Sequence, residues 1–204
     1  MILITGRNGF IGKRISYGRA FEGDITNHKS ILEQTGDVEG IIHLAAKSNK
    51  RICAADPIGC ISVNLISLCK ILEVAIMRDI WVIFISTFQS SEKSLYGLSK
   101  LTGEELCRIY KQKGAKVEIV RLPIVYGPGD KPDKIVTKLI SRIKSGKEIS
   151  IDSNDDFYFA YADDIAKLIE NEVKVMNGQV GEKCSFRTVI DGIRECLKKG
   201  EYDD

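Results

Sequence analysis

A tyrosine and a lysine four residues apart, in the segment "YGLSK", are the pair in this sequence best suited to proton transfer. Because residues four apart share one face of a helix, the side chains of Tyr96 and Lys100 are expected to lie together. A lysine ammonium near a phenol favours the phenolate and lowers the pKa of the tyrosine toward neutral pH. Such a tyrosine can exchange a proton with a substrate hydroxyl or carbonyl while hydride moves at the same carbon. The spacing is also common by chance on surface helices, so its meaning depends on the neighbouring segments.

A strand-like segment, "VIFIST", ends in two hydroxyl residues shortly before this pair. Ligands of open parallel sheets bind at the carboxyl edge of the strands, so Ser86 or Thr87 is placed to hydrogen-bond the reacting oxygen. The alternative is that one of them caps the following turn. Nine residues lead from Thr87 to Tyr96, and three further serines offer the same hydroxyl, namely Ser90, Ser91 and Ser94.

Three glycines at intervals of three, Gly6, Gly9 and Gly12, follow the first strand-like segment. This placement predicts a tight turn, close approach of the backbone to a pyrophosphate, and a helix N-terminus directed at it. A turn without a ligand is the alternative. Only 13 residues, Arg7 to Arg19, separate Gly6 from the next predicted strand. Since a parallel crossover needs about a dozen residues, we expect one short helix and the loss of one strand of the sheet.

Asp24 lies 18 residues after Gly6, close to the ~20-residue offset at which an acidic residue binds a cofactor ribose. It could serve the ribose or the adenine, or it could cap the helix predicted in "TNHKSILEQ". A ribose contact would favour NAD. NADP would be favoured if its 2′-phosphate were held by one of four basic residues, namely Arg7, Lys13, Arg14 and Arg19.

The elements that must position these residues alternate between short apolar runs and longer helical patterns. This alternation predicts an α/β, Rossmann-like, doubly wound parallel sheet that lacks one strand near the N-terminus. The predicted strands are Ile2–Thr5, Arg19–Glu22, Gly40–Leu44, Trp81–Ser86, Lys116–Leu122 and, more weakly, Glu148–Ile151. The predicted helices are Pro57–Met77, Leu95–Gln112, Asp133–Ser145, Asp163–Val173 and Ser185–Lys198. No linker divides the chain, so residues 1–204 are expected to form one domain, with 123–204 as a reduced substrate-binding portion.

The composition excludes several classes of partner. The chain is 44% hydrophobic and 28% charged with a net charge of +2, which argues against nucleic acid. Its longest apolar runs, such as "WVIFIS", are too short to span a bilayer, and no signal peptide is visible, so we expect a cytoplasmic protein without a membrane partner. Six scattered cysteines and two isolated histidines predict reduced thiols and no metal site.

Taken in order, these segments resemble the extended short-chain dehydrogenase/reductase family, in its nucleotide-sugar epimerase, dehydratase and reductase branch. The resemblance covers nearly the whole chain. It is carried by "TGRNGFIG", "GDITN", "IIHLAA", "VNLISLCKIL" with Asn64, "FIST", "YGLSK", "VRLPIVYGPGD", "FAYADDIA" and "CSFRTVIDGI".

The resemblance implies an NAD- or NADP-dependent enzyme that epimerises, dehydrates or reduces a nucleotide sugar. It implies that Thr87 polarises the substrate oxygen, that Tyr96 is the acid/base and that Lys100 holds the nicotinamide ribose. It also implies a homodimer through the helices at 57–77 and 95–112. The residues that it implies bind the cofactor are Gly6, Asn8, Gly9, Phe10, Ile11, Gly12, Asp24, Ile25, Leu44, Ala45, Ala46, Ser86, Tyr96, Lys100 and Pro123.

The sequence departs from the family pattern around the substrate. Phe157 stands where the family usually has an arginine that holds a nucleotide phosphate, and Ile124 replaces the usual asparagine before "VYGP". Arg121 is expected to be structural, which leaves Arg187 as a phosphate candidate. These departures favour an alternative, a non-catalytic dinucleotide-binding or regulatory protein on a trimmed reductase scaffold.

Overall fold

The computed structural model describes residues 1–88, 93–149, 156–171, 182–185 and 195. The chain divides into two compact units, Met1–Leu122 with Ala166–Gln179 and Pro123–Ile165 with Val180–Asp204. The boundary after Leu122 coincides with the start of the predicted substrate-binding portion. That all 204 residues form one domain stays a prediction.

The first unit contains a five-stranded sheet in the order β2-β1-β3-β4-β5, in which every neighbouring pair is parallel. This confirms the predicted Rossmann-like fold and the loss of one strand. The β-branched residues of the strands are buried on both faces, which is why they read as continuous apolar runs. The strands are β1 (Ile2–Thr5), β2 (Arg19–Ala20), β3 (Gly40–His43), β4 (Trp81–Thr87) and β5 (Lys116–Leu122).

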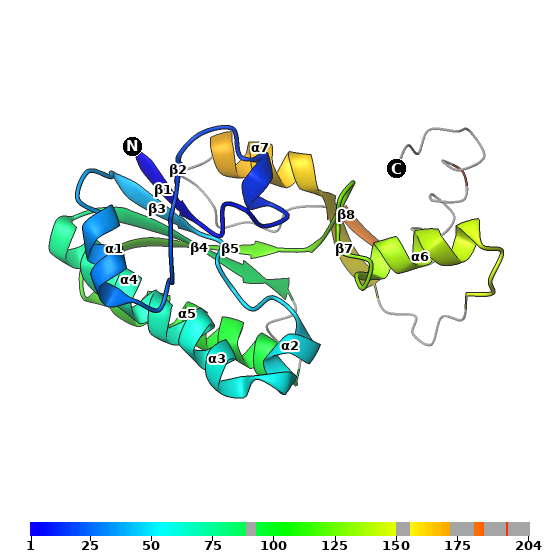
Figure 1. The fold of residues 1–204 in the computed structure, drawn as a ribbon, viewed down its shortest axis with the longest axis horizontal. Coiled ribbons are helices and arrows are strands. Elements are labelled where there is room, and N and C mark those ends of the chain that lie inside the picture. The colour runs from blue at the N-terminus through cyan, green and yellow to red at the C-terminus, as the bar shows by residue number, and fades with distance from the viewer. Residues whose placement is uncertain (89–92, 150–155, 172–181, 186–194, 196–204) are drawn as a thin grey trace. The chain divides into compact units, whose positions relative to one another are not determined.

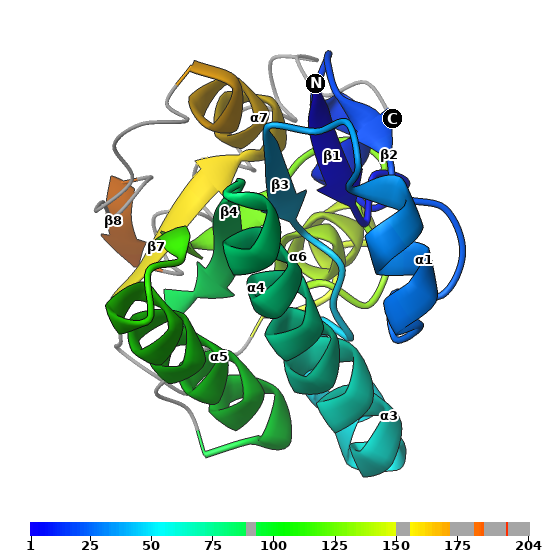
Figure 2. The ribbon, with the colours of Figure 1, turned by 90° about the vertical axis from the view of Figure 1, so that its left-hand side faces the viewer.

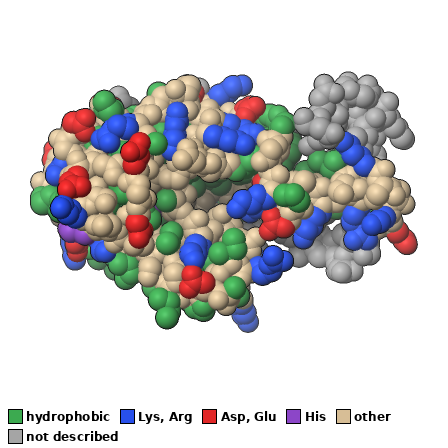
Figure 3. Space-filling view, in the orientation of Figure 1, with side chains coloured by type: hydrophobic (Ala, Val, Ile, Leu, Met, Phe, Trp, Pro, Cys, Tyr) green, Lys and Arg blue, Asp and Glu red, His purple; other side chains and the backbone are tan. Residues whose placement is uncertain are grey.

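Helices pack on both faces of this sheet (Figures 1 and 2). One face is covered by α1 (His28–Gln34), α4 (Ser67–Arg78) and α5 (Leu95–Gln112), whose apolar side chains form a common core with the strands. On the other face in Figure 1, the part of α7 that belongs to the first unit lies beside the segment that follows β1. Positive and negative side chains are interspersed over the face of this unit shown in Figure 3.

The predicted helix at 57–77 is a continuous helical stretch of three parts: α3 (Pro57–Ile61), the π-helical turn η2 (Ser62–Ile66) and α4. It is preceded by α2 (Lys50–Ala55). Within the described part of the chain, Pro57–Arg78 is the one stretch long and apolar enough, by length and composition, to cross a membrane. The expectation that every apolar segment is too short is therefore wrong. Leu68, Leu72 and Ala75 are buried in the core, which accounts for the apolar composition.

The second unit contains a three-stranded sheet that the sequence did not predict. Its central strand, β7 (Asp156–Tyr161), pairs in parallel with β6 (Ile124–Tyr126) and in antiparallel with β8 (Glu182–Ser185). Phe159 of β7 packs with Val136 and Leu139 of α6 (Ile135–Lys144). β7 leads directly into α7 (Ala162–Asn171), whose first turn carries Asp163 and Asp164.

Two predictions in this unit are wrong at part of their length. The strand predicted at Glu148–Ile151 does not form at Glu148 and Ile149, and its other two residues lie outside the described part of the chain. The helix predicted from Ser185 does not begin there, because Ser185 ends β8. Glu195 is helical as predicted, and most of the rest of that predicted helix, with Arg187, lies outside the described residues.

Candidate active site

The glycine loop after β1 is closed so tightly that side chains are excluded from it. A Cβ at Gly6, whose φ is +71°, would lie 2.7 Å from the backbone N of Ala45. A Cβ at Gly12 would lie 2.4 Å from the carbonyl oxygen of Gly6. The backbone N of Gly9 donates to that same oxygen at 2.9 Å. Glycine is therefore required at these positions by close backbone contacts, within the loop and with the segment after β3.

The predicted helix after the glycine loop is wrong. The segment forms only η1 (Gly12–Arg14), a single 3₁₀ turn, before the chain turns at Gly18 (φ +84°) into β2. The crossover is too short to hold an α-helix and still return in parallel. Because one turn sums few peptide dipoles, the loop has no helix macrodipole, and anion binding here would depend on local backbone N–H groups.

The ends of β1 and β3 are joined by a buried hydrogen-bond chain. Thr5 Oγ1 accepts from the backbone N of Ala45 at 3.2 Å and lies 2.7 Å from Nδ1 of His43. Which of the two groups donates in the bond between Thr5 and His43 depends on the tautomer of the imidazole ring. Nε2 is the one buried side-chain nitrogen or oxygen without a hydrogen-bond partner among the described residues. The sequence analysis assigned no role to His43. Aligning the last residues of the strands β1 and β3 would have placed His43 beside Thr5.

Acid is expected to destabilise the fold through His43. Burial, with a smaller effect of the charge of Lys100, lowers the pKa of His43 to about 3. Between that pKa and the ordinary value near 6.5, the unfolded chain binds a proton that the folded chain excludes, so stability falls as the pH falls. From pH 6.5 to pH 5 this single group should cost about 1.5 kcal/mol. Urea unfolding of wild type and His43→Gln at both pH values measures it, and an equal loss in the variant would contradict it.

Asp24 follows β2 as an exposed acid that stabilises its own turn. Its carboxylate accepts from the backbone N and the Oγ1 of Thr26, both at 2.8 Å, and these bonds lower its pKa. The alternative that Asp24 caps the next helix is wrong, because Asn27 accepts from the first backbone N–H groups of α1. The carboxylate thus remains ionised and exposed to solvent. The side chain of Ile25 is buried in the core of the first unit.

The other residues predicted to contact a cofactor lie in the same loop and at nearby strand ends. Asn8 is exposed, and Phe10 packs beneath the guanidinium of Arg14, with 4.4 Å from its carbon to the ring centre. The remaining half-buried positions are Ile11, Leu44, Ala45 and Ala46. Pro123 is buried and belongs to the second unit.

Tyr96 lies in the first turn of α5, against the end of β4. Its side chain is 9% exposed and is hydrogen-bonded to the side chain of Thr87. The nine-residue gap thus still brings the two predicted catalytic residues together. The side chain of Ser94 caps α5 by accepting from the backbone N of Gly97. Ser90 and Ser91 lie outside the described residues.

Lys100 lies one turn beyond Tyr96, but its ammonium group is bound to the sheet. Nζ donates to the carbonyl oxygen of Ile85 at 2.7 Å and lies 4.8 Å from the ring centre of Phe84. Burial lowers the pKa of Lys100 to about 8. Burial also raises the pKa of Tyr96, against a smaller opposing effect of the hydrogen bond with Thr87. The prediction that Lys100 lowers the pKa of Tyr96 is therefore wrong for this structure.

A buried carboxylate that the sequence analysis missed joins β4, α5 and β5. Glu104 is fully buried and receives Ser86 Oγ at 2.6 Å and two guanidinium nitrogens of Arg121 at 2.8 and 2.6 Å. Burial acts to raise the pKa of Glu104, but these partners outweigh it and the pKa is lowered. Arg121 is structural, as predicted. Ser86 does not cap the next turn, because its hydroxyl is donated to Glu104.

The wall beside Tyr96 contains a disulfide and a buried amide. Cys53 and Cys60 are bonded and pack against Tyr96, so the expectation that all thiols are reduced is wrong for this pair. Asn64, in η2, accepts from the backbone N of Lys47 at 2.8 Å and donates to Ser99 Oγ at 2.9 Å. Asn64 thereby ties the segment after β3 to α5, the helix that carries Tyr96 and Lys100. Within the described ranges no group of His, Cys, Asp and Glu could hold a metal ion.

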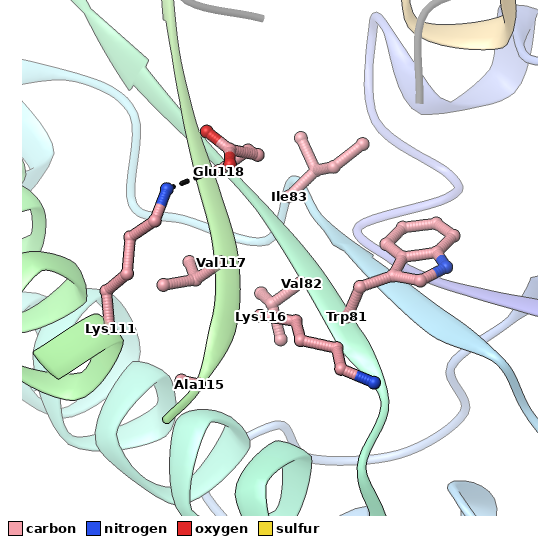
Figure 4. Close-up of a pocket in the computed structure, with 8 residues that line it drawn as sticks. All are labelled: Trp81, Val82, Ile83, Lys111, Ala115, Lys116, Val117 and Glu118. Carbon is pink, nitrogen blue, oxygen red and sulfur yellow. Dashed lines mark hydrogen bonds and ion pairs between the residues drawn. The ribbon is translucent and has the colours of Figure 1, made fainter. Parts of the chain in front are cut away.

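One surface pocket lies at the opposite ends of β4 and β5 (Figure 4). It is lined by Trp81, Val82, Ile83, Lys111, Ala115, Lys116, Val117 and Glu118. Its lysines are already paired, Lys111 with Glu118 at 2.9 Å and Lys116 with Asp79 at 2.7 Å. The strand ends at this edge carry none of the candidate catalytic residues, so the candidate site remains at the Thr87 end of β4.

Comparison with known proteins identifies the family. The family model described as "NAD dependent epimerase/dehydratase family" matches residues 16–173. The chain belongs to the NAD-dependent epimerase/dehydratase family. The resemblance proposed from the motifs is thereby confirmed. The glycine loop, where the crossover is shortened, precedes the matched residues.

Individual members of the family align with different parts of the chain. An uncharacterized UDP-glucose epimerase of Bacillus subtilis, YtcB, is 40% identical over 82 residues, which cover 39% of this chain and 26% of that protein. The UDP-2-acetamido-2,6-beta-L-arabino-hexul-4-ose reductase of Pseudomonas aeruginosa is 28% identical over 198 residues, covering 91% of this chain and 52% of that protein. The chain thus spans about half the length of this second relative and about a quarter of the first.

Solved structures of this kind share the fold. A double mutant of the dTDP-glucose 4,6-dehydratase DesIV from Streptomyces venezuelae, solved with NAD bound, aligns with a TM-score of 0.82 over 97% of this chain and 81% of that one. At 18% sequence identity this similarity shows a common fold.

Proposed function

We propose that the chain is an NAD- or NADP-dependent enzyme that epimerises, dehydrates or reduces a nucleotide sugar. The observation that carries the proposal is the hydrogen bond between Thr87 and Tyr96 at the carboxyl end of β4, with Lys100 one turn further along the helix. The glycine loop lies at the same carboxyl edge of the sheet, where open parallel sheets bind their ligands.

The residues present fit a dinucleotide cofactor. A Cβ at Gly6 or Gly12 would meet backbone atoms at 2.7 and 2.4 Å, so the turn after β1 keeps the tight glycine geometry of a diphosphate cradle. We infer that these residues would hold the diphosphate and that Asp24 would hold the ribose or the adenine. When bound, the nicotinamide supplies a hydride acceptor or donor. The choice between NAD and NADP depends on what surrounds the adenosine ribose.

The chain's own residues would move the proton. Because burial raises the pKa of Tyr96, its phenol is neutral at physiological pH and is poised to donate the Oη proton to a substrate oxygen. The hydroxyl of Thr87, already bonded to Tyr96, would share that oxygen. Lys100 would add positive charge and favour the phenolate if its ammonium group left the carbonyl of Ile85.

A nucleotide sugar is the substrate class that the relatives' names support. The Pseudomonas relative is named for reduction of a UDP-linked sugar, and the Bacillus relative for epimerisation of UDP-glucose. Incubating the protein with cofactor and UDP- or dTDP-linked hexoses, with chromatographic detection of products, tests the proposal. Cofactor binding without turnover of any such sugar would favour the non-catalytic alternative.

A homodimer is part of the same proposal. Several apolar side chains on the helices at 57–77 and 95–112 are exposed, including Ile58 at 80%, Met77 at 63% and Leu98 at 56%. A second copy that covered these helices would remove such side chains from water. Sedimentation at micromolar concentration tests it, and a monomer throughout would count against it. A cytoplasmic location stays a prediction.

Substitution of Gly12 with alanine is expected to weaken cofactor binding by about tenfold or more. The added Cβ would meet the carbonyl oxygen of Gly6 at 2.4 Å, and overpacking of this kind costs about 1–3 kcal/mol. Calorimetric titration with NAD measures the change. Gly36→Ala is the matched control, because its Cβ would meet only the flexible tip of Arg78. Equal affinity of Gly12→Ala and wild type would contradict the cradle.

A further inference from the structure

We propose that Arg7 is a positioning residue that takes the place of the missing helix behind the glycine loop. The inference rests on the proposed function, since the loop that Arg7 holds is the proposed cofactor cradle. In an α-helix, the backbone carbonyls after the third glycine would be satisfied by amides four residues further on. Here the segment forms one 3₁₀ turn, in which the backbone N of Ile15 donates to the carbonyl of Gly12 at 3.2 Å, so it is the carbonyls of Ile15 and Tyr17 that need other donors.

The side chain of Arg7 supplies these donors. Its NH1 donates to the carbonyl oxygens of Ile15 at 2.5 Å, Tyr17 at 3.1 Å and Gly12 at 3.3 Å. One guanidinium thus connects the beginning, middle and end of the crossover. All three contacts come from one nitrogen of a planar guanidinium that holds it in place, whereas a lysine ammonium sits at the end of a flexible four-carbon stem.

The same residue also forms the floor of the cradle. A Cβ at Gly12 would lie 2.8 Å from the Cα of Arg7 and 2.7 Å from its carbonyl oxygen. The backbone of Arg7 therefore touches Gly12 from one side, while its side chain binds the carbonyl of Gly12 and two carbonyls beyond. Arg7 fixes Gly12 relative to Gly6, and this relation sets the shape of the cradle.

The far end of the crossover has a second anchor. The backbone N of Ser16 donates to the carboxylate of Glu170, and the hydroxyl of Tyr17 lies 3.5 Å from the carbonyl oxygen of Ile169. Glu170 and Ile169 lie in the part of α7 that belongs to the first unit. The crossover is thus held from within by Arg7 and from outside by α7, instead of by its own helical hydrogen bonds.

These contacts also argue against another role for Arg7, as the receptor of the 2′-phosphate of NADP. Its NH1 nitrogen is already bound to three carbonyl oxygens of the crossover. A 2′-phosphate receptor would affect NADP alone, whereas a residue that shapes the cradle affects both cofactors, because NAD and NADP share the diphosphate.

The test compares Arg7→Lys, which keeps the charge, with Arg19→Lys. Arg19 is the matched control because it also donates to a backbone carbonyl, that of Gln34 at 2.7 Å. Loss of about two hydrogen bonds is expected to weaken NAD and NADP equally, by about tenfold, whereas Arg19→Lys should stay within about twofold for NAD. In Arg7→Ala, added ethylguanidinium should restore NAD affinity and butylammonium should not. Unchanged affinities in Arg7→Lys, or a loss for NADP alone, would overturn the proposal.

Amide hydrogen exchange of the protein without cofactor tests the role of Arg7 independently of the proposed function. Amide hydrogen exchange of residues 12–17 should be faster in Arg7→Lys than in wild type, while exchange in β3 and β4 is unchanged. If the wild-type protein bound neither cofactor, the proposed function would fail, but faster exchange confined to the crossover would still support Arg7 as its brace. Unchanged exchange in the crossover would overturn the brace.

Discussion

Substitution of Tyr96 with phenylalanine is expected to lower turnover of the nucleotide sugar by about 10²- to 10⁴-fold while leaving cofactor affinity within about twofold. The change removes the Oη that is bonded to Thr87 and keeps the ring that packs against Cys53 and Cys60. The fold should therefore be preserved, and the loss should fall on the proton-transfer step. Steady-state kinetics and calorimetric titration of the cofactor measure the two effects separately.

Tyr110→Phe is the matched control for this experiment. Tyr110 lies on the same helix, and its hydroxyl is bonded to Glu73 at 3.1 Å rather than to Thr87. Its substitution should leave turnover unchanged. Full activity of Tyr96→Phe, or an equal loss in both variants, would show that Tyr96 does not carry the proton.

Substitution of Arg121 with methionine is expected to destabilise the fold by about 3–5 kcal/mol, because it leaves Glu104 as a buried and weakly compensated carboxylate. Glu104 has no exposed side-chain surface and receives two of its hydrogen bonds from Arg121. Since these bonds help to keep the pKa of Glu104 lowered, their contribution is present at neutral pH and is lost as the pH falls through that pKa. Urea unfolding at pH 7 measures the loss.

Two further variants sharpen the test of this ion pair. Arg108 also reaches Glu104, but through one contact at 3.3 Å rather than the two bonds of 2.8 and 2.6 Å made by Arg121, so Arg108→Met should cost less than about 1 kcal/mol. Combining Arg121→Met with Glu104→Gln removes the uncompensated charge and should recover part of the loss. A cost of Arg121→Met no larger than that of Arg108→Met would contradict a structural role for the pair.

The sheet and the long helices of the first unit could be predicted because each is a local pattern. β1, β3 and β4 are buried on both faces and therefore appear as continuous apolar runs, whereas the edge strand β5 mixes buried apolar with partly exposed charged residues. The three strands of the second unit were missed because their pairing depends on residues far apart in the chain. β6 has only three residues, directly after Pro123, and its partner β7 begins at Asp156.

The candidate site could be predicted in its residues but not in their contacts. The spacing placed Tyr96 and Lys100 on adjacent turns of one helix, but it could not show that Nζ of Lys100 binds the carbonyl of Ile85. Glu104 was missed because a glutamate on an amphipathic helix usually faces water. Its burial depends on Arg121 and Ser86, which belong to two neighbouring strands.

In the glycine loop, too, the residues could be predicted from the sequence but their contacts could not. Its tight turn followed from three glycines, and its missing strand followed from the length of the crossover. The expected helix was replaced by a 3₁₀ turn and the side chain of Arg7. A role for Arg7 in satisfying distant carbonyls has no local signature in the sequence.

Calorimetric titration of the intact protein with NAD and NADP tests the central claim most directly. The cradle at Gly6 and Gly12 predicts saturable binding of at least one cofactor, which Gly12→Ala weakens and Tyr96→Phe leaves intact. Absence of binding to either cofactor at millimolar concentration would contradict the account.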